Sequence, residues 1–230
     1  MPRPAACLFD LDGLLLDTEP LHGQAWREAA AAFELRLSEA SLMELRGRRR
    51  SDNGEQVRRW IAAEGRRPPS ADELLAIQQP IARQLMARAA AMPGARQLVE
   101  RCSELGVPMA LVTSSSSESL AVKSAPHPWL EAIAERVLGD DPQLAAGKPA
   151  PDPFLLAARR LGVSPQRCWA FEDSPAGAQS AAAAGCRVHV LVPPGLSERE
   201  RGRLYPGNWL FLESLLEVSL EGELDQPGGC

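Results

Sequence analysis

Two aspartates, Asp10 and Asp12, directly follow the apolar run Ala5-Ala6-Cys7-Leu8-Phe9 and directly precede Gly13. A strand of an α/β sheet presents ligand-binding groups at its carboxyl end, so this pattern predicts two carboxylates at one strand end. One carboxylate can attack an electrophile or bind a metal ion, while the other can move protons. The pair indicates phosphoryl transfer through an aspartyl-phosphate, although acids in such a place also cap helices.

Three distant segments supply the other groups that this chemistry needs. Thr113 and Ser114 follow an apolar run, and their hydroxyl and backbone N–H groups can hold phosphoryl oxygens. Lys148, between a glycine and a proline, can neutralise the charge of a phosphate and an attacking carboxylate. Glu172 and Asp173 end another apolar run and can bind a divalent cation. The serines at 115–117 have the simpler interpretation of helix caps.

Lysine is scarce in this chain, because nearly every basic residue is an arginine. Lys123 and Lys148 are the only lysines. A lysine kept in a chain that otherwise uses arginine indicates that a compact ammonium matters at Lys148, although a composition bias toward arginine could also leave two lysines by chance. The sequence assigns no role to Lys123.

A parallel sheet is the element that brings these segments together. From residue 92 onward, predicted strands alternate with predicted helices, which is typical of a Rossmann-like α/β sheet with right-handed crossovers. The predicted strands cover residues 108–113, 136–138, 167–171 and 187–192, and the predicted helices cover residues 95–105, 152–161, 175–184 and a last one near 211–218.

The eighty residues after Gly13 have a different character, rich in alanine, leucine, glutamate and arginine. They predict helices at 20–33, 38–45, 53–64 and 70–91, the last one kinked at Pro80. We therefore expect a core domain formed by residues 1–14 and 92–230, with an inserted α-helical cap domain at residues 15–91.

Composition limits the partners. A formal charge of −5 and a pI near 5.4 argue against nucleic acid, because such binding needs a broad basic face. No apolar run approaches the roughly 18 to 20 residues of a membrane helix. Five cysteines without CxxC spacing indicate a reducing, cytoplasmic setting. We expect a small-molecule partner and a monomer or weak homodimer.

The four motifs, in this order, resemble those of the haloacid dehalogenase-like hydrolases, in the β-phosphoglucomutase-like branch with a helical cap. Phe9-Asp10-Leu11-Asp12-Gly13 resembles the first motif of that family, Thr113 the second, Lys148 the third and Glu172-Asp173 the fourth. The resemblance implies that Asp10 is the nucleophile and Asp12 the general acid and base. It also implies Mg²⁺ held by Asp10, Asp173 and the backbone carbonyl of Asp12, with Glu172 as a direct or an outer ligand.

Within that family, the core is similar to pseudouridine-5′-phosphatases and to flavin mononucleotide or polyol phosphatases. This implies a Mg²⁺-dependent phosphatase for a phosphorylated sugar, polyol or nucleoside monophosphate. A β-phosphoglucomutase-like phosphomutase is the alternative enzyme, and a non-catalytic phospholigand-binding regulatory protein is the alternative of another class. Asp12 argues against a dehalogenase, and a cap without lysine argues against a phosphonoacetaldehyde hydrolase.

Substrate choice is expected to come from the cap, where residues 46–59 hold six arginines and two acids. Gly47 with Arg48 or Arg50 is the candidate contact to a remote part of the substrate, although a solvated helix start would have the same composition. His22 resembles a histidine near the hinge of sugar-phosphate mutases that contacts the acid-base aspartate. We therefore include it among the candidate substrate-binding residues.

Overall fold

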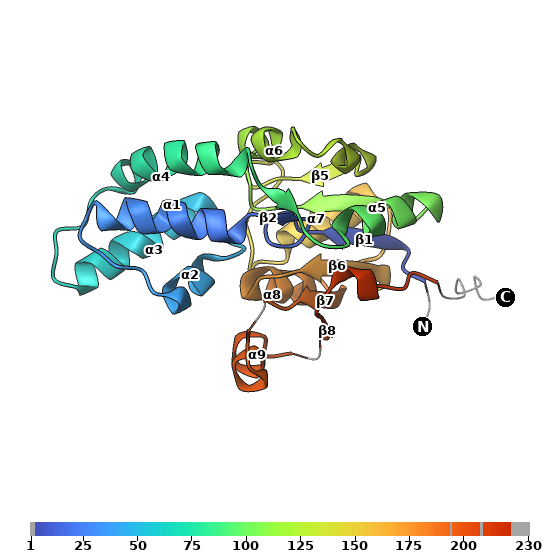
Figure 1. The fold of residues 1–230 in the computed structure, drawn as a ribbon. Helices are drawn as coiled ribbons and strands as arrows, with labels where there is room; N and C mark the ends of the chain where they lie inside the picture. The colour runs from blue at the N-terminus through green and yellow to red at the C-terminus, as the bar shows by residue number, and fades with distance from the viewer. Residues whose placement is uncertain (1–2, 194, 208, 222–230) are drawn as a thin grey trace.

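Six parallel strands form one sheet in the computed structural model, in the order β5-β4-β1-β6-β7-β8. The structure describes residues 3–193, 195–207 and 209–221. Figure 1 shows the sheet with its surrounding helices on one side and a separate group of helices on the other. The strands are β1 (Ala6–Phe9), β4 (Met109–Val112), β5 (Glu135–Val137), β6 (Cys168–Glu172), β7 (Arg187–Leu191) and β8 (Leu210–Leu212). The predicted α/β parallel sheet is confirmed.

The central strand β1 is apolar throughout because both of its faces are covered. It pairs with β4 on one side and β6 on the other, so that Phe9 lies level with Leu111 and with Phe171. The backbone N–H of Asp10 continues this ladder by donating to the carbonyl of Phe171 at 3.0 Å. The carboxyl ends of three neighbouring strands therefore meet at one edge of the sheet.

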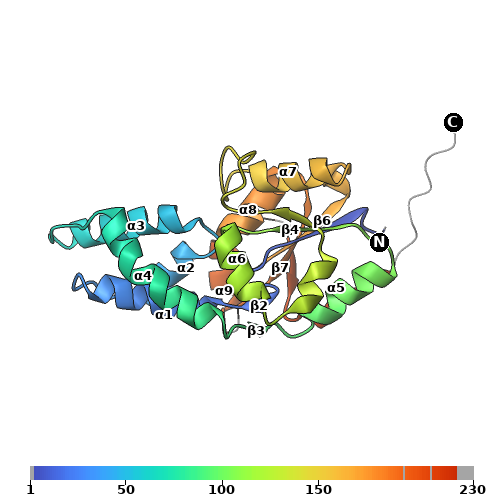
Figure 2. The same ribbon diagram turned by 90° about the horizontal axis from the view of Figure 1, so that it is seen from above.

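Helices cover both faces of the sheet, as Figure 2 shows from above. Residues such as Phe9 and Leu98 belong to one apolar cluster, whereas Leu8 and Phe154 belong to a second cluster on the opposite face. The first face is covered by α5 (Ala95–Glu104) and α6 (Ser117–Ser124), and the second by α7 (Asp152–Arg160) and α8 (Pro175–Ala183). The short helix α9 (Glu198–Leu204) follows β7.

Four further helices, α1 to α4, form a unit with its own apolar cluster, which includes Trp26, Val57, Ile61 and Leu74. We call this unit the cap. Its helices are α1 (Glu19–Ala31), α2 (Glu39–Leu45), α3 (Arg50–Ala63) and α4 (Ala71–Met86). Ser70 begins α4 with a capping box, in which its hydroxyl accepts from the N–H of Glu73 and its own N–H donates to the Glu73 carboxylate.

Two expected helices are wrong in part. The helix expected over residues 70–91 ends at Met86, because Ala90–Ala91 (β3) pairs antiparallel with Leu16–Asp17 (β2) beside the junction of cap and sheet. Near the end of the chain, a helix was expected at 211–218. Residues Leu210–Leu212 instead pair with β7 as an edge strand, and only a short 3₁₀ turn, Leu215–Glu217, follows.

Within the described parts of the chain, no helix combines the length and the apolar character needed to cross a membrane.

Candidate active site

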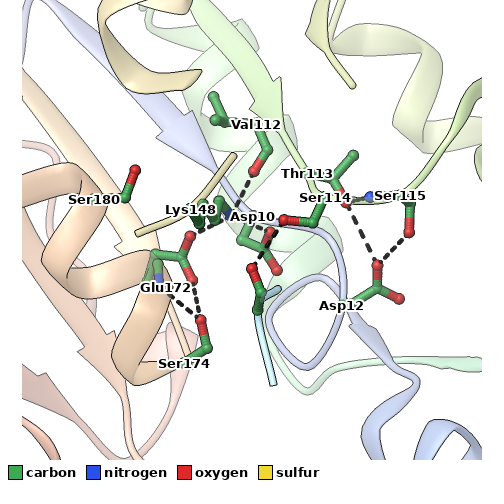
Figure 3. A network of polar contacts seen from close by, with 12 residues as sticks. Asp10, Asp12, Val112, Thr113, Ser114, Ser115, Lys148, Glu172, Ser174 and Ser180 are labelled. Atoms are coloured by element: carbon green, nitrogen blue, oxygen red, sulfur yellow. Dashed lines mark hydrogen bonds and ion pairs between the residues drawn. The ribbon is translucent and has the colours of Figure 1, made fainter. Parts of the chain in front are cut away.

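The nucleophile candidate Asp10 is buried at the carboxyl end of β1, with 2% of its surface exposed. Lys148 donates to Asp10 Oδ1 at 2.6 Å, to Glu172 Oε1 at 2.5 Å and to the carbonyl of Val112 at 2.8 Å (Figure 3). All three ammonium hydrogens are therefore used. Burial alone would lower the pKa of Lys148, but the two carboxylates outweigh it and raise that pKa, so the ammonium stays charged.

A group of three carboxylates lies at the same place. Oxygens of Asp10, Glu172 and Asp173 all lie within 4.8 Å of one another. Both Asp173 oxygens are buried without a hydrogen-bond partner, and burial, followed by repulsion from Glu19, Asp10 and Glu172, raises the pKa of Asp173 well above its ordinary value. Arg46 Nη1, 3.9 Å from Asp173 Oδ2, lies too far away to hydrogen-bond this carboxylate. A buried carboxylate without hydrogen bonds among other carboxylates favours a bound cation, and hard oxygen ligands fit Mg²⁺.

Glu172 differs from Asp173 because both of its oxygens are engaged. Oε1 accepts from Lys148, and Oε2 accepts from the Ser174 hydroxyl at 3.1 Å. A Cβ added at Gly177 would lie 2.0 Å from the Glu172 carboxyl carbon, so only glycine leaves room for this side chain. Glu172 is thus mainly a partner of Lys148, and Asp10 and Asp173 remain the freer candidate ligands for a cation.

Asp12 points away from Asp10, toward the end of β4 (Figure 3). Burial would raise the pKa of Asp12, but the charge of Lys123 and the hydrogen bond from His22 hold it well below its usual range. Its carboxylate is therefore ionised in this arrangement. Oδ1 accepts from Thr18 Oγ1 at 2.7 Å and from Lys123 Nζ at 2.5 Å and lies 3.2 Å from His22 Nε2, while Oδ2 accepts from Ser115 Oγ at 2.8 Å and from Thr113 Oγ1 at 3.5 Å.

Lys123 is a site residue that the sequence interpretation missed. It lies on α6 with 0% of its surface exposed, and it reaches Ser115 Oγ at 2.8 Å and His22 Nε2 at 3.3 Å in addition to Asp12. The one signal in the sequence was the scarcity of lysine. Ser115, expected to be a cap, contacts Asp12 instead, whereas Ser116 does cap α6 by accepting from the Ser119 N–H.

The two phosphate-binding candidates follow β4. Thr113 is buried, and its Oγ1 accepts from the N–H of Ser115 at 3.1 Å. The Ser114 hydroxyl donates to the carbonyl of Gly47 at 2.8 Å, so this side chain joins the sheet to the cap. A phosphate contact from Ser114 would therefore come from its backbone N–H.

A cavity of about 770 Å³ lies between the cap and the end of the sheet. It brings most of the predicted site residues together: Asp10, Asp12, Thr113 and Ser114 from the core, and His22, Gly47, Arg48 and Arg50 from the cap. Its wall does not include Lys148, Glu172 or Asp173, which are all buried.

The arginines of the cap segment have different environments. Arg46 Nε lies 3.0 Å from Glu19 Oε2, and its Nη1 lies 3.9 Å from Asp173 Oδ2. Arg49 packs against Gly147, where a Cβ would lie 2.5 Å from its Nε. Glu19 was also missed by the sequence interpretation. Burial raises the pKa of Glu19 to about 7 against the opposing charge of Arg46. Arg48 and Arg50 line the cavity and form no ion pair with the described residues.

Known proteins are similar to this chain in sequence and in fold. The sequence model of a family described as haloacid dehalogenase-like hydrolase matches residues 4–185. A probable pseudouridine-5′-phosphatase of Drosophila melanogaster is 35% identical over 198 residues, covering 84% of each chain. Hexitol phosphatase A of Escherichia coli (strain K12) is 33% identical, covering 84% of this chain and 85% of its own. The structure of a CbbY variant from Rhodobacter sphaeroides with xylulose-(1,5)bisphosphate has a TM-score of 0.76 and 28% identity, covering 93% of this chain and 96% of its own.

Proposed function

This chain belongs to the haloacid dehalogenase-like hydrolases, and we propose that it is a Mg²⁺-dependent phosphatase that acts through an aspartyl-phosphate. The chain is a phosphomonoester hydrolase. The proposed substrate is a small phosphorylated sugar, polyol or nucleoside monophosphate, which is the range of substrates that the names of its relatives span. The observation that carries the mechanism is the buried Asp10, held by Lys148 next to the Asp173 carboxylate, which accepts no hydrogen bond.

Asp10, Asp173 and the backbone carbonyl of Asp12 would hold Mg²⁺, which would supply positive charge for the phosphate, with Glu172 close enough to join them. A phosphate dianion repels a carboxylate, so Asp10 can attack phosphorus only where that repulsion is neutralised. Lys148 donates to Asp10 Oδ1 and provides part of this neutralisation from within the chain. The other oxygen, Oδ2, is then the atom that attacks.

Thr113 and the N–H of Ser114 lie at the cavity wall and would bind the transferring phosphoryl oxygens. Asp12 would give a proton to the leaving oxygen and would later take one from the attacking water. Its ionised state in this arrangement suits the second of these steps, in which a base is needed. The proton for the first step would have to reach Asp12 when substrate enters.

The wider setting belongs to the same proposal. Residues 15–91 would act as a cap over a core of residues 1–14 and 92–230, since the cavity has walls from both. Cys7, Cys102, Cys168 and Cys186 are free and buried, which supports a reducing cytoplasmic location. A small phosphorylated metabolite would be the only required partner, without nucleic acid or membrane, and the protein would be a monomer or weak homodimer.

The test is phosphate release from a panel of phosphorylated metabolites and p-nitrophenyl phosphate, with Mg²⁺ and with a chelator. We expect Mg²⁺-dependent release, and we expect Asp10→Asn to lose turnover by several orders of magnitude, because the amide cannot form the acyl-phosphate. Activity above a few per cent in Asp10→Asn would exclude the covalent mechanism.

A mutase would give a different product from the same intermediate. Glucose 1-phosphate with a bisphosphate primer would then become glucose 6-phosphate with little inorganic phosphate. We expect phosphate release to dominate, and isomerisation without release would replace the phosphatase with the mutase.

A further inference from the structure

Gln78 is a polar residue on the apolar face of a cap helix. The buried residues of α4 are Leu74, Gln78, Ala82 and Met86, which recur every four residues as the inner face of a helix does. Gln78 has 0% of its surface exposed, yet neither its Oε1 nor its Nε2 has a hydrogen-bond partner. A buried amide without partners costs about 1–3 kcal/mol. Packing alone would therefore favour an apolar residue here.

Gln78 also lies at the wall of the cavity that holds Asp10. A second incompletely paired amide, Asn53, lies at the same wall on α3, the helix that packs against α4. Asn53 Nδ2 donates to the carbonyl of Leu45 at 2.9 Å, whereas its Oδ1 has no partner. These two amides thus present two carbonyl oxygens that lack donors and one NH₂ group that lacks an acceptor, and Arg49 Nε at the same wall is a further buried donor without an acceptor.

The chemistry of these atoms selects the ligand. A carboxylate or a phosphate dianion can only accept hydrogen bonds, so it would leave both amide oxygens unpaired. A hydroxyl can donate to Oε1 or Oδ1 and accept from Nε2. Adjacent hydroxyls on one carbon chain or ring can donate to both amide oxygens and accept from the Gln78 NH₂ group, which an anion cannot do.

We propose that Gln78 is a specificity-determining residue that binds hydroxyl groups of a neutral sugar or polyol leaving group, with Asn53 as its second acceptor. This inference rests on the proposed phosphatase function and narrows its substrate class to polyhydroxylated phosphomonoesters. A cavity of about 770 Å³ can hold such a molecule, with its phosphate at Asp10 and its hydroxyls against the cap. A site built to hydrogen-bond a hydroxyl discriminates strongly against ligands that lack one.

Gln78→Met tests this assignment, because methionine has a similar length and no polar group to leave unpaired. Gln79→Met is the matched control, since Gln79 is the next residue of the same helix and is exposed. The measurements are kcat/KM for sorbitol 6-phosphate, glycerol 3-phosphate, phosphoglycolate and p-nitrophenyl phosphate, and the melting temperature with and without sorbitol 6-phosphate.

We expect Gln78→Met to keep or raise the melting temperature without ligand, because the substitution removes an amide without hydrogen-bond partners from the apolar face of α4. It should lower kcat/KM for the two hydroxylated substrates by about tenfold or more. Turnover of p-nitrophenyl phosphate should stay within about twofold of wild type. Sorbitol 6-phosphate should raise the melting temperature of wild type and of Gln79→Met more than that of Gln78→Met.

Three results would overturn the assignment. A lower melting temperature of Gln78→Met without ligand would show that the Gln78 amide stabilises the fold and is not kept for binding. An equal loss with p-nitrophenyl phosphate would remove the specificity role, and a wild-type preference for phosphoglycolate would refute the substrate class. Failure of the phosphatase function looks different: wild type would release phosphate from none of the four compounds. The ligand-induced shift in melting temperature would then still decide the role of Gln78.

Discussion

Lys123 Nζ lies 2.5 Å from Asp12 Oδ1, so each carboxylate of the Asp10 and Asp12 pair is bound by its own buried lysine. The two lysines are the only ones in the chain, and both are almost completely inaccessible to solvent. A compact ammonium can donate in three directions, and Lys123 reaches Asp12, Ser115 and His22 from α6. We infer that Lys123 positions Asp12, the proposed acid-base carboxylate, as Lys148 positions Asp10, the proposed nucleophile.

Replacing Lys123 with methionine tests this role through the pH dependence of turnover. The charge of Lys123 lowers the pKa of Asp12 against the effect of burial, so its removal should raise that pKa. At a given pH more Asp12 is then protonated, and the acidic limb of kcat should move to higher pH. We also expect kcat to fall by about 10- to 100-fold at neutral pH, because the carboxylate loses its strongest donor.

The double variant Lys123→Met/Asp12→Asn is the control for stability. Lys123→Met alone leaves a buried carboxylate with fewer partners and should lower the melting temperature, whereas the double variant removes both charges and should recover part of the loss. An unchanged acidic limb in the single variant would contradict a role for Lys123 in setting the state of Asp12.

Three of the core residues that the sequence predicted share one local signal. Asp10, Thr113 and Asp173 each follow a short apolar run, and parallel strands bring such ends to one edge of a sheet. Lys123 and Gln78 carry no such signal because each lies within a helix, and the contact of Lys123 with Asp12 spans 111 residues. Only the packed structure reveals that contact.

The misassigned elements have a related cause. The apolar residues of Leu210–Leu212 fit a helix or a strand equally well, and pairing with β7 decides between them. The β2 and β3 strands contain two residues each, which is too short for any period to appear in the sequence. Their pairing depends on the two chain crossings between cap and sheet lying side by side.

Removing the Asp173 carboxylate should separate metal binding from folding. We expect Mg²⁺ to raise the melting temperature of wild type, since an ion that binds only the folded state stabilises it. Asp173→Asn should lose this rise. Without metal it should melt at a higher temperature than wild type, because the substitution removes one negative charge from the mutually repelling carboxylates of Asp10, Glu172 and Asp173. Thermal melts with and without Mg²⁺ measure both effects.

Glu172→Gln is the comparison for that experiment. Both Glu172 oxygens are engaged by Lys148 and Ser174, so this variant should keep more of the Mg²⁺-induced rise than Asp173→Asn does. If Glu172→Gln lost more of the Mg²⁺-induced rise than Asp173→Asn, Glu172 would be the more important metal ligand of the two.

His189 should make stability depend on pH. Its ring stacks against Phe171 with centroids 4.8 Å apart and packs at a tilt against Trp169 at 4.7 Å. Burial, then the charge of Arg187, lowers the pKa of His189 to about 4. In the unfolded chain, His189 takes up a proton near pH 6.5. The buried, neutral His189 therefore contributes fully to the free energy of unfolding above that pH, and this contribution is lost as the pH falls toward 4. With 4% of the residue exposed, the loss is on the order of 2–3 kcal/mol. His189→Phe keeps a stacked ring, and its free energy of unfolding should fall less than that of wild type between pH 7 and pH 4.5. Equal falls in the two proteins would contradict this.

Gly47 should be necessary for the close packing of the cap against the core. A Cβ at this position would lie 2.0 Å from the Ser174 hydroxyl oxygen. That hydroxyl donates to the Glu172 carboxylate, and the same carboxylate accepts from Lys148. The carbonyl of Gly47 also accepts from Ser114, so a displaced Gly47 disturbs both sides of the site. We expect Gly47→Ala to lower kcat/KM by about 10- to 100-fold for every substrate, including p-nitrophenyl phosphate.

Gly65→Ala separates that contact from backbone strain. Gly47 and Gly65 have nearly the same φ, +72° and +73°, so alanine costs each about the same in conformation, on the order of 1 kcal/mol. A Cβ at Gly65 meets no described atom within 4 Å. Both variants should therefore lose similar melting temperature from strain, and only Gly47→Ala should lose activity. If Gly65→Ala lost as much activity, a strained cap backbone would explain the result. If neither lost activity, the approach of Gly47 to Ser174 would play no part in positioning Lys148.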